Sequence, residues 1–347
     1  MRSIVTLIVF LVTAARAYPV EFSFVAGTEI LPEFSSAEVQ LSTFTTNKII
    51  VGESFAYDGD DGNFLYQLTG SGGMVTLTDA HDDFYVANCP RCNESPVLLW
   101  DVDTNSLLRR FVVDETNFTL SPPGFWGMGV AVGENYVASA DQRGNTAVFS
   151  IATGEQVLDL PVERGPDFTG QSGVDFFGDK LLTGSTGNGV DGALTQSVIL
   201  VDIPSGEIEL EIAAELRDGL AFGVGVGLSD DALFIHDNFQ LLKYDYEGNL
   251  LASVASPPGV SSQVEYADGY VRVFSSIYDE DLNLVLEHPN QITSILGDRF
   301  LSFDGIDFDM QTGRVIGNFS VHTIPEPSGA LLVIVAAVSL TALRRRP

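Results

Sequence analysis

The clearest alternation of apolar and polar residues lies between Phe222 and Val254. Apolar residues recur there at about every second position in four short runs, GVGVGL, ALFIHD, QLLKYDY and LLASV. Such alternation is typical of β-strands with one buried face. The breaks include Ser229-Asp230-Asp231 and Glu247-Gly248-Asn249, residue types that bend the chain at low cost. The segment therefore predicts a unit of four short strands joined by tight turns.

The opening half of this unit recurs along the chain. Each copy combines an apolar strand, a polar turn and a second apolar strand. The turns lie at Asn47, Asp83, Asn135, Asp179, Asp231, Asp268 and Asp298. Their mean spacing is about 42 residues, which is typical of one propeller blade.

A second series of turns gives an independent count. We expect these turns to join the two outer strands of each unit, and they lie at Gly62, Asn105, Gly154, Gly206, Gly248, Asn283 and Gly313. A lone blade cannot bury both of its faces, so stacking in a ring is expected. The two series predict an all-β fold, a single β-propeller of about seven four-stranded blades. The spacing shortens near the end, so six or eight blades are also compatible.

The segment before the first unit, residues 18–37, has two interpretations. Its VEFSFVAG either adds an outer strand that closes the ring or lies on the ring surface. We expect the propeller itself over residues 38–321. In pattern, this body resembles the FG-GAP-like and quinoprotein-like propellers with Asp-x-x-Thr-Gly turns. That resemblance implies the architecture and no active site.

Composition agrees with many short strands around a large core, since 45% of the 347 residues are hydrophobic and 34 are glycine. Residues 18–325 contain 12 basic and 46 acidic side chains, a formal net charge of -34. A surface this negative repels phosphate backbones, which excludes nucleic acid as a partner. A solvated acidic surface is the simpler interpretation, and specific binding of cations is the alternative.

Residues 1–17 have the pattern of a secretory signal peptide. Arg2 precedes an apolar run from Ile4 to Val12, and small residues follow at Ala15 and Ala17. We expect cleavage between Ala17 and Tyr18. The run of nine residues is too short to span a bilayer.

The other end of the sequence predicts a marginal membrane span. Gly329 to Leu343 are fifteen residues without a charge, followed by Arg344, Arg345 and Arg346. A helix of that length rises about 22 Å, against a hydrocarbon core of about 30 Å. The arginines should stay on the cytoplasmic side as an anchor, leaving the body outside.

This tail, residues 324–347, resembles the PEP-CTERM sorting signal of exported bacterial proteins. A Pro-Glu-Pro motif, a short apolar helix and an arginine cluster follow one another in that order. The resemblance implies that a membrane-embedded exosortase recognises Pro325, Glu326 and Pro327. Cleavage there would release the body or re-anchor it at the surface of a bacterium that makes extracellular polysaccharide. An ordinary C-terminal anchor is the alternative, since short motifs also arise by chance.

Two local patterns suggest chemistry. Cys89 and Cys92 are the two cysteines of the chain, and we expect a small structural disulfide between them in an oxidising compartment. A redox pair is the alternative, although no helix N-terminus follows to depress the thiol pKa. The acidic turns from Asp58 to Asn63 and from Asp279 to Asn283 approach a calcium loop but lack required positions. We expect solvated turns, with no cofactor; calcium is the alternative.

No convergent catalytic set is visible, since the four histidines are scattered and no G-x-S-x-G motif occurs. Asp141 and His236-Asp237 end equivalent second strands and could meet at one mouth of the ring, although ordinary turn residues are the simpler interpretation. The leading hypothesis is a non-enzymatic exported propeller that serves as a binding or structural module of the cell envelope or extracellular matrix. Its candidate partners are extracellular polysaccharide and another envelope protein. The alternatives are a glycan hydrolase or lyase with paired carboxylates in the channel, and a calcium-stiffened surface protein.

Overall fold

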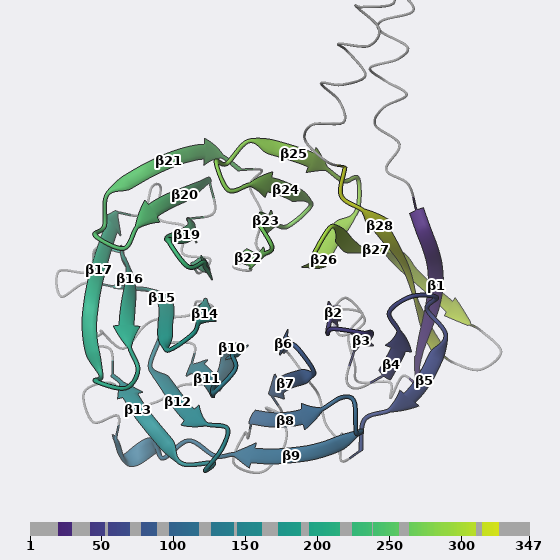
Figure 1. Cartoon of the computed structure of the whole chain (residues 1–347), viewed down its shortest axis with the longest axis horizontal. Helices are drawn as coiled ribbons and strands as arrows, with labels where there is room; N and C mark the ends of the chain where they lie inside the picture. Colours follow the sequence, from purple (N-terminus) through teal and green to yellow (C-terminus); the bar gives the residue numbers. More distant parts are fainter. Residues whose placement is uncertain are drawn as a thin grey trace, which may run out of the picture.

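The computed structural model describes residues 20–29, 42–52, 55–69, 78–88, 97–117, 126–141, 144–161, 173–188, 194–215, 224–237, 239–256, 264–309 and 314–325. These residues form seven four-stranded antiparallel sheets that stand as blades around a central axis (Figure 1). The predicted all-β propeller of seven blades is therefore confirmed. Within the described ranges, no helix is long and apolar enough to cross a membrane.

Each blade runs from an inner to an outer strand. The first blade contains β2 (Ser42–Phe44), β3 (Lys48–Val51), β4 (Phe55–Asp58) and β5 (Phe64–Gln67). The second contains β6 (Thr78–His81), β7 (Phe84–Asn88), β8 (Val97–Asp101) and β9 (Ser106–Phe111), followed by the 3-10 helix η2 (Glu115–Asn117). The third contains β10 (Trp126–Val132), β11 (Tyr136–Asp141), β12 (Thr146–Ser150) and β13 (Gln156–Leu160). The fourth contains β14 (Val174–Phe177), β15 (Lys180–Asn188), β16 (Leu194–Asp202) and β17 (Glu207–Glu215).

The remaining blades follow in the same order around the ring. The fifth contains β18 (Gly225–Leu228), β19 (Ala232–His236), β20 (Gln240–Asp245) and β21 (Leu250–Ala255). The sixth contains β22 (Val264–Ala267), β23 (Tyr270–Val273), β24 (Ser276–Asp279) and β25 (Leu284–Glu287). The shorter spacing of turns near the end of the chain therefore reflects a complete blade with short strands. The seventh contains β26 (Gln291–Leu296), β27 (Arg299–Asp309), β28 (Arg314–Thr323) and β1 (Val20–Glu29).

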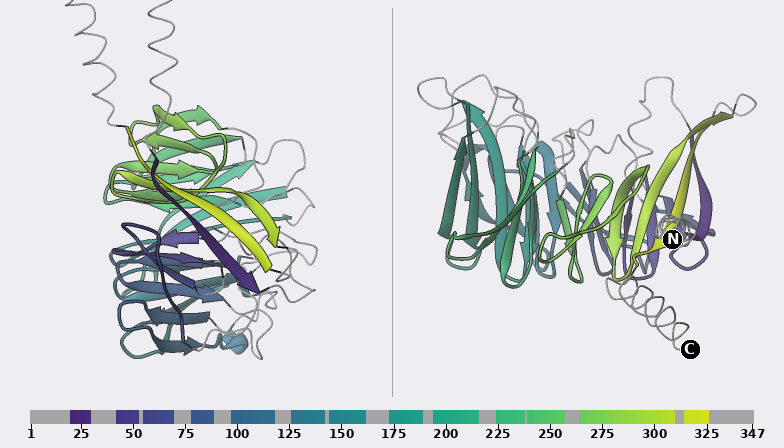
Figure 2. Two further views of the ribbon diagram at one scale, coloured as in Figure 1. Left: turned by 90° about the vertical axis from the view of Figure 1, so that its right-hand side faces the viewer. Right: turned by 90° about the horizontal axis from the view of Figure 1, so that it is seen from above.

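The N-terminal strand closes the ring, which decides between the two interpretations of residues 18–37. β1 pairs antiparallel with β28, with Ser23 opposite Ser320 and Phe24 opposite Phe319. The last blade therefore draws three strands from one end of the chain and its outer strand from the other. The pairing also puts both ends of the described chain together, since Val20 lies opposite His322 (Figure 2).

One predicted turn has a different place from the one expected. All seven turns of the first series join first and second strands, and six of the second series join third and fourth strands. Gly313 lies outside the described residues, but in the sequence it falls between the end of β27 at Asp309 and the start of β28 at Arg314, which are the second and third strands of the last blade. The prediction that it joins an outer pair was wrong because β1 supplies the fourth strand there.

The hydrophobic core lies between the blades rather than inside them. Seven buried clusters occur, and each combines residues of two neighbouring blades. The cluster between the last and first blades includes Phe24, Phe44, Tyr57 and Phe319. Burying one large apolar side chain contributes about 1.5–3 kcal/mol, so each blade depends on both of its neighbours for stability.

Candidate functional site in the central channel

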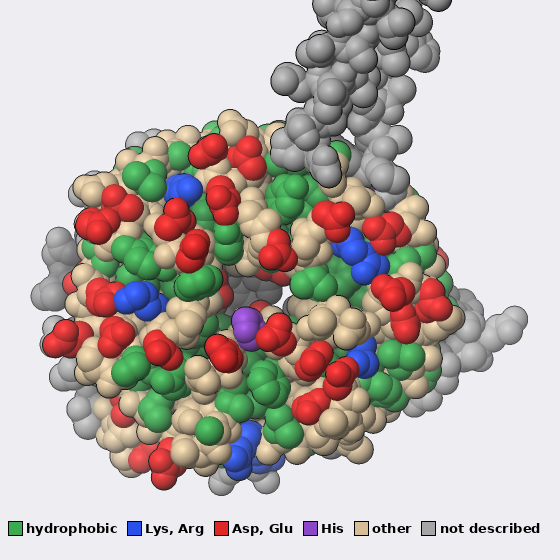
Figure 3. Space-filling model, in the orientation of Figure 1, with side chains coloured by type: hydrophobic (Ala, Val, Ile, Leu, Met, Phe, Trp, Pro, Cys, Tyr) green, Lys and Arg blue, Asp and Glu red, His purple; other side chains and the backbone are tan. Residues whose placement is uncertain are grey.

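The inner strands place one equivalent residue of each blade around the central axis. This position lies five residues before the start of the second strand of each blade. In blade order its occupants are Thr43, Asp79, Ala131, Asp175, Gly227, Glu265 and Ser294. We call these seven residues the channel ring. Acids alternate with small residues, and the two hydroxyl residues meet where the first and last blades adjoin. Figure 3 shows a hollow at the centre of the wheel with acidic side chains near its rim.

Each acid of the channel ring accepts a hydrogen bond from the backbone of the next blade. The Val132 N–H donates to Asp79 Oδ2 at 2.8 Å, and the Leu228 N–H donates to Asp175 Oδ2 at 2.7 Å. The Ile295 N–H donates to Glu265 Oε1 at 3.1 Å. An inner strand is the edge of its sheet, so some of its N–H groups need a partner outside the sheet. The acids supply that partner across three of the blade interfaces.

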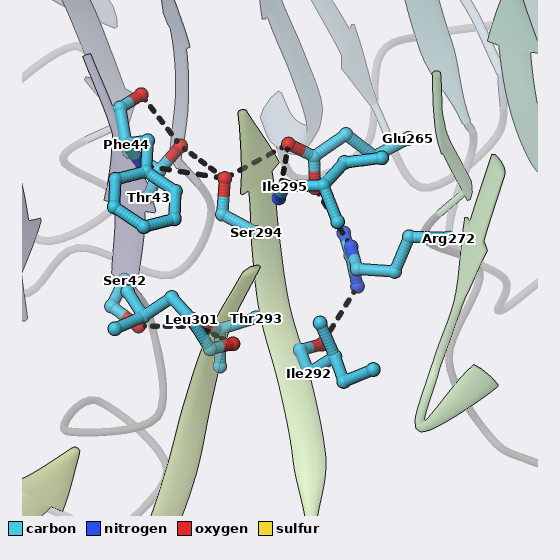
Figure 4. Close-up of polar contacts among 10 residues, drawn as sticks. All are labelled: Ser42, Thr43, Phe44, Glu265, Arg272, Ile292, Thr293, Ser294, Ile295 and Leu301. Carbon is cyan, nitrogen blue, oxygen red and sulfur yellow. Dashed lines mark hydrogen bonds and ion pairs between the residues drawn. The ribbon is translucent and has the colours of Figure 1, made fainter. Parts of the chain in front are cut away.

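The interface between the last and first blades uses hydroxyl groups for the same purpose (Figure 4). The Phe44 N–H donates to Ser294 Oγ at 3.2 Å, which repeats the geometry of the acids. Ser294 Oγ in turn donates to Glu265 Oε1 at 2.8 Å. Ser42 Oγ donates to Thr293 Oγ1 at 2.7 Å across the same interface. A chain of polar contacts therefore runs from the sixth blade through the seventh to the first.

Arg272 is a buried cation behind this chain of contacts. Its Nε lies 2.7 Å from Glu265 Oε2, and its Nη1 donates to the Ile292 carbonyl at 3.0 Å. Its side chain is 5% exposed. The buried charge therefore depends on these partners to replace the hydrogen bonds that it would make with water. The guanidinium therefore holds Glu265 in place against the seventh blade.

The other two acids of the channel ring favour their neutral form. Desolvation raises the pKa of Asp79 to about 7, against the lowering effect of the Val132 and Ala80 N–H groups; Glu265 raises it further, and Arg272 lowers it. Desolvation also raises the pKa of Asp175 well above its usual value, and the charges of Asp79 and Glu265 add to that effect. Like charges in one desolvated space disfavour ionisation of both groups.

The carboxylate oxygens of the channel ring are largely committed to the protein. Asp175 accepts the Phe176 N–H at 2.8 Å on Oδ1 and the Leu228 N–H on Oδ2. Glu265 uses Oε1 for the seventh blade and Oε2 for Arg272. Within the described part of the chain, no group of three or more His, Cys, Asp or Glu side chains is arranged to hold a metal ion. The arrangement can join blades and bind protons.

A second buried polar group lies in the last blade. Ser302 Oγ contacts His322 Nε2 at 3.0 Å and donates to Asp304 Oδ1 at 2.8 Å. The His322 ring stacks on Phe300, with 4.6 Å between centroids, and lies edge-on to His288. Although Ser, His and Asp meet here, Ser302 is fully buried and Asp304 binds hydroxyls rather than orienting the imidazole. This is a packing arrangement and lacks the geometry of a nucleophilic triad.

Most site residues predicted from the sequence lie outside the described residues. These are Ala17, Tyr18, Cys89, Cys92, Glu326, Pro327, Arg344, Arg345 and Arg346. Pro325 is described and exposed, directly after the buried Ile324. The expected sorting motif therefore begins at the last described residue, directly after the buried end of the wheel.

The acidic turns use their carboxylates for their own backbone. The Asp60 N–H donates to Asp58 Oδ1 at 2.8 Å, and the Asn283 N–H donates to Asp279 Oδ1 at 2.8 Å. Asp141, at the end of β11, likewise accepts the Asn145 N–H at 2.9 Å. His236 ends β19 and is buried. These contacts match the interpretation as turn residues, and calcium binding stays the untested alternative.

The sequence reasoning missed the acids of the channel ring. Asp79, Asp175 and Glu265 are each the one acid of a four-residue first strand, at the same distance from the turn. A signal was present, because an acid stands at the same position in three of the seven repeats, and acids seldom lie inside a fold without a partner. Alignment of the repeats by their turns would have found it.

Comparison with known proteins supports the fold only. No protein-family model matches the chain, and no curated protein matches its sequence. Among solved structures, the chain is similar to the computationally designed Ika8 protein, with 15% identity, a TM-score of 0.50, and coverage of 88% of this chain and 99% of that one. It is also similar to a chain from the mitotic checkpoint complex, with 13% identity, a TM-score of 0.56, and coverage of 90% and 97%.

Proposed function

We propose that this chain is an exported β-propeller that serves as a binding or structural module of the cell envelope or extracellular matrix. The observation that carries the proposal is that the acids of the channel ring serve to join neighbouring blades. Its acids accept hydrogen bonds from neighbouring blades, and Asp175 and Glu265 have protein partners on both oxygens. Side chains that already hold the scaffold together leave recognition to its outer surfaces.

The export part of the proposal rests on the two ends of the sequence. Residues 1–17 are the expected leader, and residues 324–347 are the expected sorting signal with its transmembrane helix over 329–343. Val20 lies opposite His322, so a leader and a tail would leave the wheel side by side. An exosortase-like enzyme would then act on Pro325, Glu326 and Pro327 close to the folded body.

The sorting proposal is tested by Glu326→Ala in the full chain, expressed in the producing bacterium. We expect an unprocessed, membrane-bound form, detected by fractionation and by the mass of the product. Ser328→Ala is the matched control, because it alters the same segment outside the motif. Normal processing of Glu326→Ala would defeat the sorting proposal.

The binding proposal is tested separately with the secreted protein and the exopolysaccharide of the producing bacterium. We expect saturable binding by calorimetry or sedimentation. A dextran of similar size is the control ligand, since it offers sugar without specific recognition. Equal binding of both polysaccharides, or of neither, would count against recognition of this glycan and leave a structural role or a protein partner.

A secreted glycan hydrolase or lyase is the second candidate. One observation favours it, because carboxyls that hold a proton near neutral pH are suited to act as general acids. Asp79 and Asp175 meet that condition. Release of reducing ends from the same exopolysaccharide, lost in Asp175→Asn, would support the enzyme. Absence of turnover in the wild type would remove this candidate.

A further inference from the structure

The channel ring concentrates acids at the centre of the wheel with little positive charge to balance them. The inner strands β2, β10, β18 and β26 contain no ionisable side chain, so the acids that the inner strands bring to the channel ring are Asp79, Asp175 and Glu265. Arg272 is the cation that acts on Asp79, and it forms an ion pair with Glu265. The group therefore has more negative charge than its one nearby cation can neutralise.

The strands packed against β6 and β14 provide no further cation for these acids. β6 packs against β2, β7 and β10, and β14 packs against β10, β11, β15 and β18. The ionisable side chains of these strands are Tyr85, Tyr136, Asp141 and Lys180. Tyr85 donates to the Gly52 carbonyl, Asp141 holds Asn145, and Lys180 pairs with Glu209 at 2.5 Å. His81, on β6 itself, lies beside Asp82 and is exposed.

The hydrogen bonds between blades hold Asp79 and Asp175 where they are. Each carboxyl accepts an N–H of the next blade, so it cannot turn away toward solvent without leaving that N–H unpaired. A protonated carboxyl still accepts such a bond through its carbonyl oxygen. Protonation therefore removes the repulsion between the acids and keeps the contacts between blades.

We propose that Asp79 and Asp175 form a proton-binding pair at the centre of the wheel, which couples the cohesion of the blades to pH. The closed wheel holds protons that the unfolded chain releases. Stability contributed by the pair is fully present below about pH 4, the usual range of an aspartate, and is lost as the pH rises from there through the folded-state pKa of each group. The raised pKa values of both groups have the sign that this coupling requires. The charge of Asp79 raises the pKa of Asp175, so the protons are counted for the two groups together.

The test compares the wild type with the double variant Asp79→Asn, Asp175→Asn. Asparagine keeps an acceptor oxygen for the N–H groups of Val132 and Leu228 and removes the proton site. Calorimetric unfolding at pH 6 in buffers of different ionisation enthalpy counts the protons exchanged. We expect the wild type to release about two more protons than the variant. The difference between the two proteins cancels the contribution of all histidines.

The melting temperature gives a second readout. We expect it to fall in the wild type as the pH rises from 6 to 8, and to fall much less in the double variant. Asp230→Asn is the control, since it removes one charge from an exposed turn and should keep the wild-type slope. If the double variant does not fold, the two single variants replace it in both measurements. Each single variant should then release about one proton fewer than the wild type on unfolding. Equal proton release and equal slopes in wild type and variants would overturn the proposal.

Discussion

At the scale of single residues, the surroundings rather than the residue type decide the chemistry. Asp245 ends β20 just before a hairpin turn, where the Asn249 side chain and N–H hold its pKa below the usual value. Asp79 has its pKa raised to about 7, because it is desolvated in the channel wall. Turn chemistry is local, so the turn residues could be predicted from the sequence. The channel acids could not, because their desolvation comes from other blades.

His322 gives a prediction at this scale. Burial and the neighbouring His288 lower its pKa to about 4, so the folded state stays neutral where the unfolded chain takes up a proton. Its stabilising effect is present above about pH 6.5 and is lost as the pH falls toward 4. At pH 5 we expect unfolding of His322→Gln to take up about one proton less than wild type, measured by calorimetry in two buffers.

The control for His322 is His81→Gln, because His81 is an exposed histidine of the same chain. If His322→Gln behaves like His81→Gln, the imidazole of His322 is already protonated in the folded protein and the proposed cause is wrong.

At the scale of elements, the outer hairpins repeat one turn geometry. In six blades, the pairing of third and fourth strands shifts by one residue just after the turn. Five of these turns contain a residue with positive φ at the predicted position, namely Gly62, Asn105, Gly154, Gly206 and Gly248. A left-handed residue followed by a bulge is a common way to close a short hairpin. In the sixth blade, Leu282 rather than Asn283 adopts the positive φ.

Gly62 and Gly154 form a matched pair for a test of these turns. Both have positive φ, at 73° and 79°, so alanine introduces similar backbone strain of about 1–2 kcal/mol at each. A Cβ on Gly62 would lie 2.7 Å from Phe24 Cβ, whereas the nearest atom to one on Gly154 is Arg109 Cδ at 3.7 Å. We therefore expect Gly62→Ala to lower the free energy of unfolding more than Gly154→Ala does, measured by urea denaturation.

Equal losses of unfolding free energy in the two variants would mean that β1 does not contact the Gly62 turn in solution. A Cβ on Gly62 would also lie 2.9 Å from Phe22 Cε2, so the additional loss in Gly62→Ala reports contact with β1 as a whole. Gly154→Ala measures the strain within a turn, and the difference between the two variants measures the contact with the closing strand.

At the scale of the whole molecule, the wheel is held shut by its two ends. The Phe24 ring lies 5.4 Å from Phe319 in its own blade and 5.0 Å from Tyr57 in the first blade, between ring centroids. Glu21 adds an ion pair with Arg299 at 2.9 Å and accepts a hydrogen bond from Thr323 at 2.8 Å. β1 therefore joins the last blade to the first.

Phe24→Ala should weaken this closure. The side chain is 7% exposed, and truncation of a buried phenylalanine costs about 3–5 kcal/mol. Val25→Ala is the control on the same strand, because Val25 is 57% exposed and should change stability little. Chemical denaturation measures both, and similar stabilities of the two variants would show that β1 does not contribute to the closed core.

The sequence by itself determined the strand-and-turn repeat and a count of about seven blades, because alternation and turn chemistry act between residues close in the chain. Only the tertiary structure decided that the N-terminal strand completes the last blade, with Glu21 and Thr323 in contact across 302 positions. It also decided that Asp79, Asp175 and Glu265 share one channel. Both outcomes depend on ring closure, which brings distant residues together and removes water from between them.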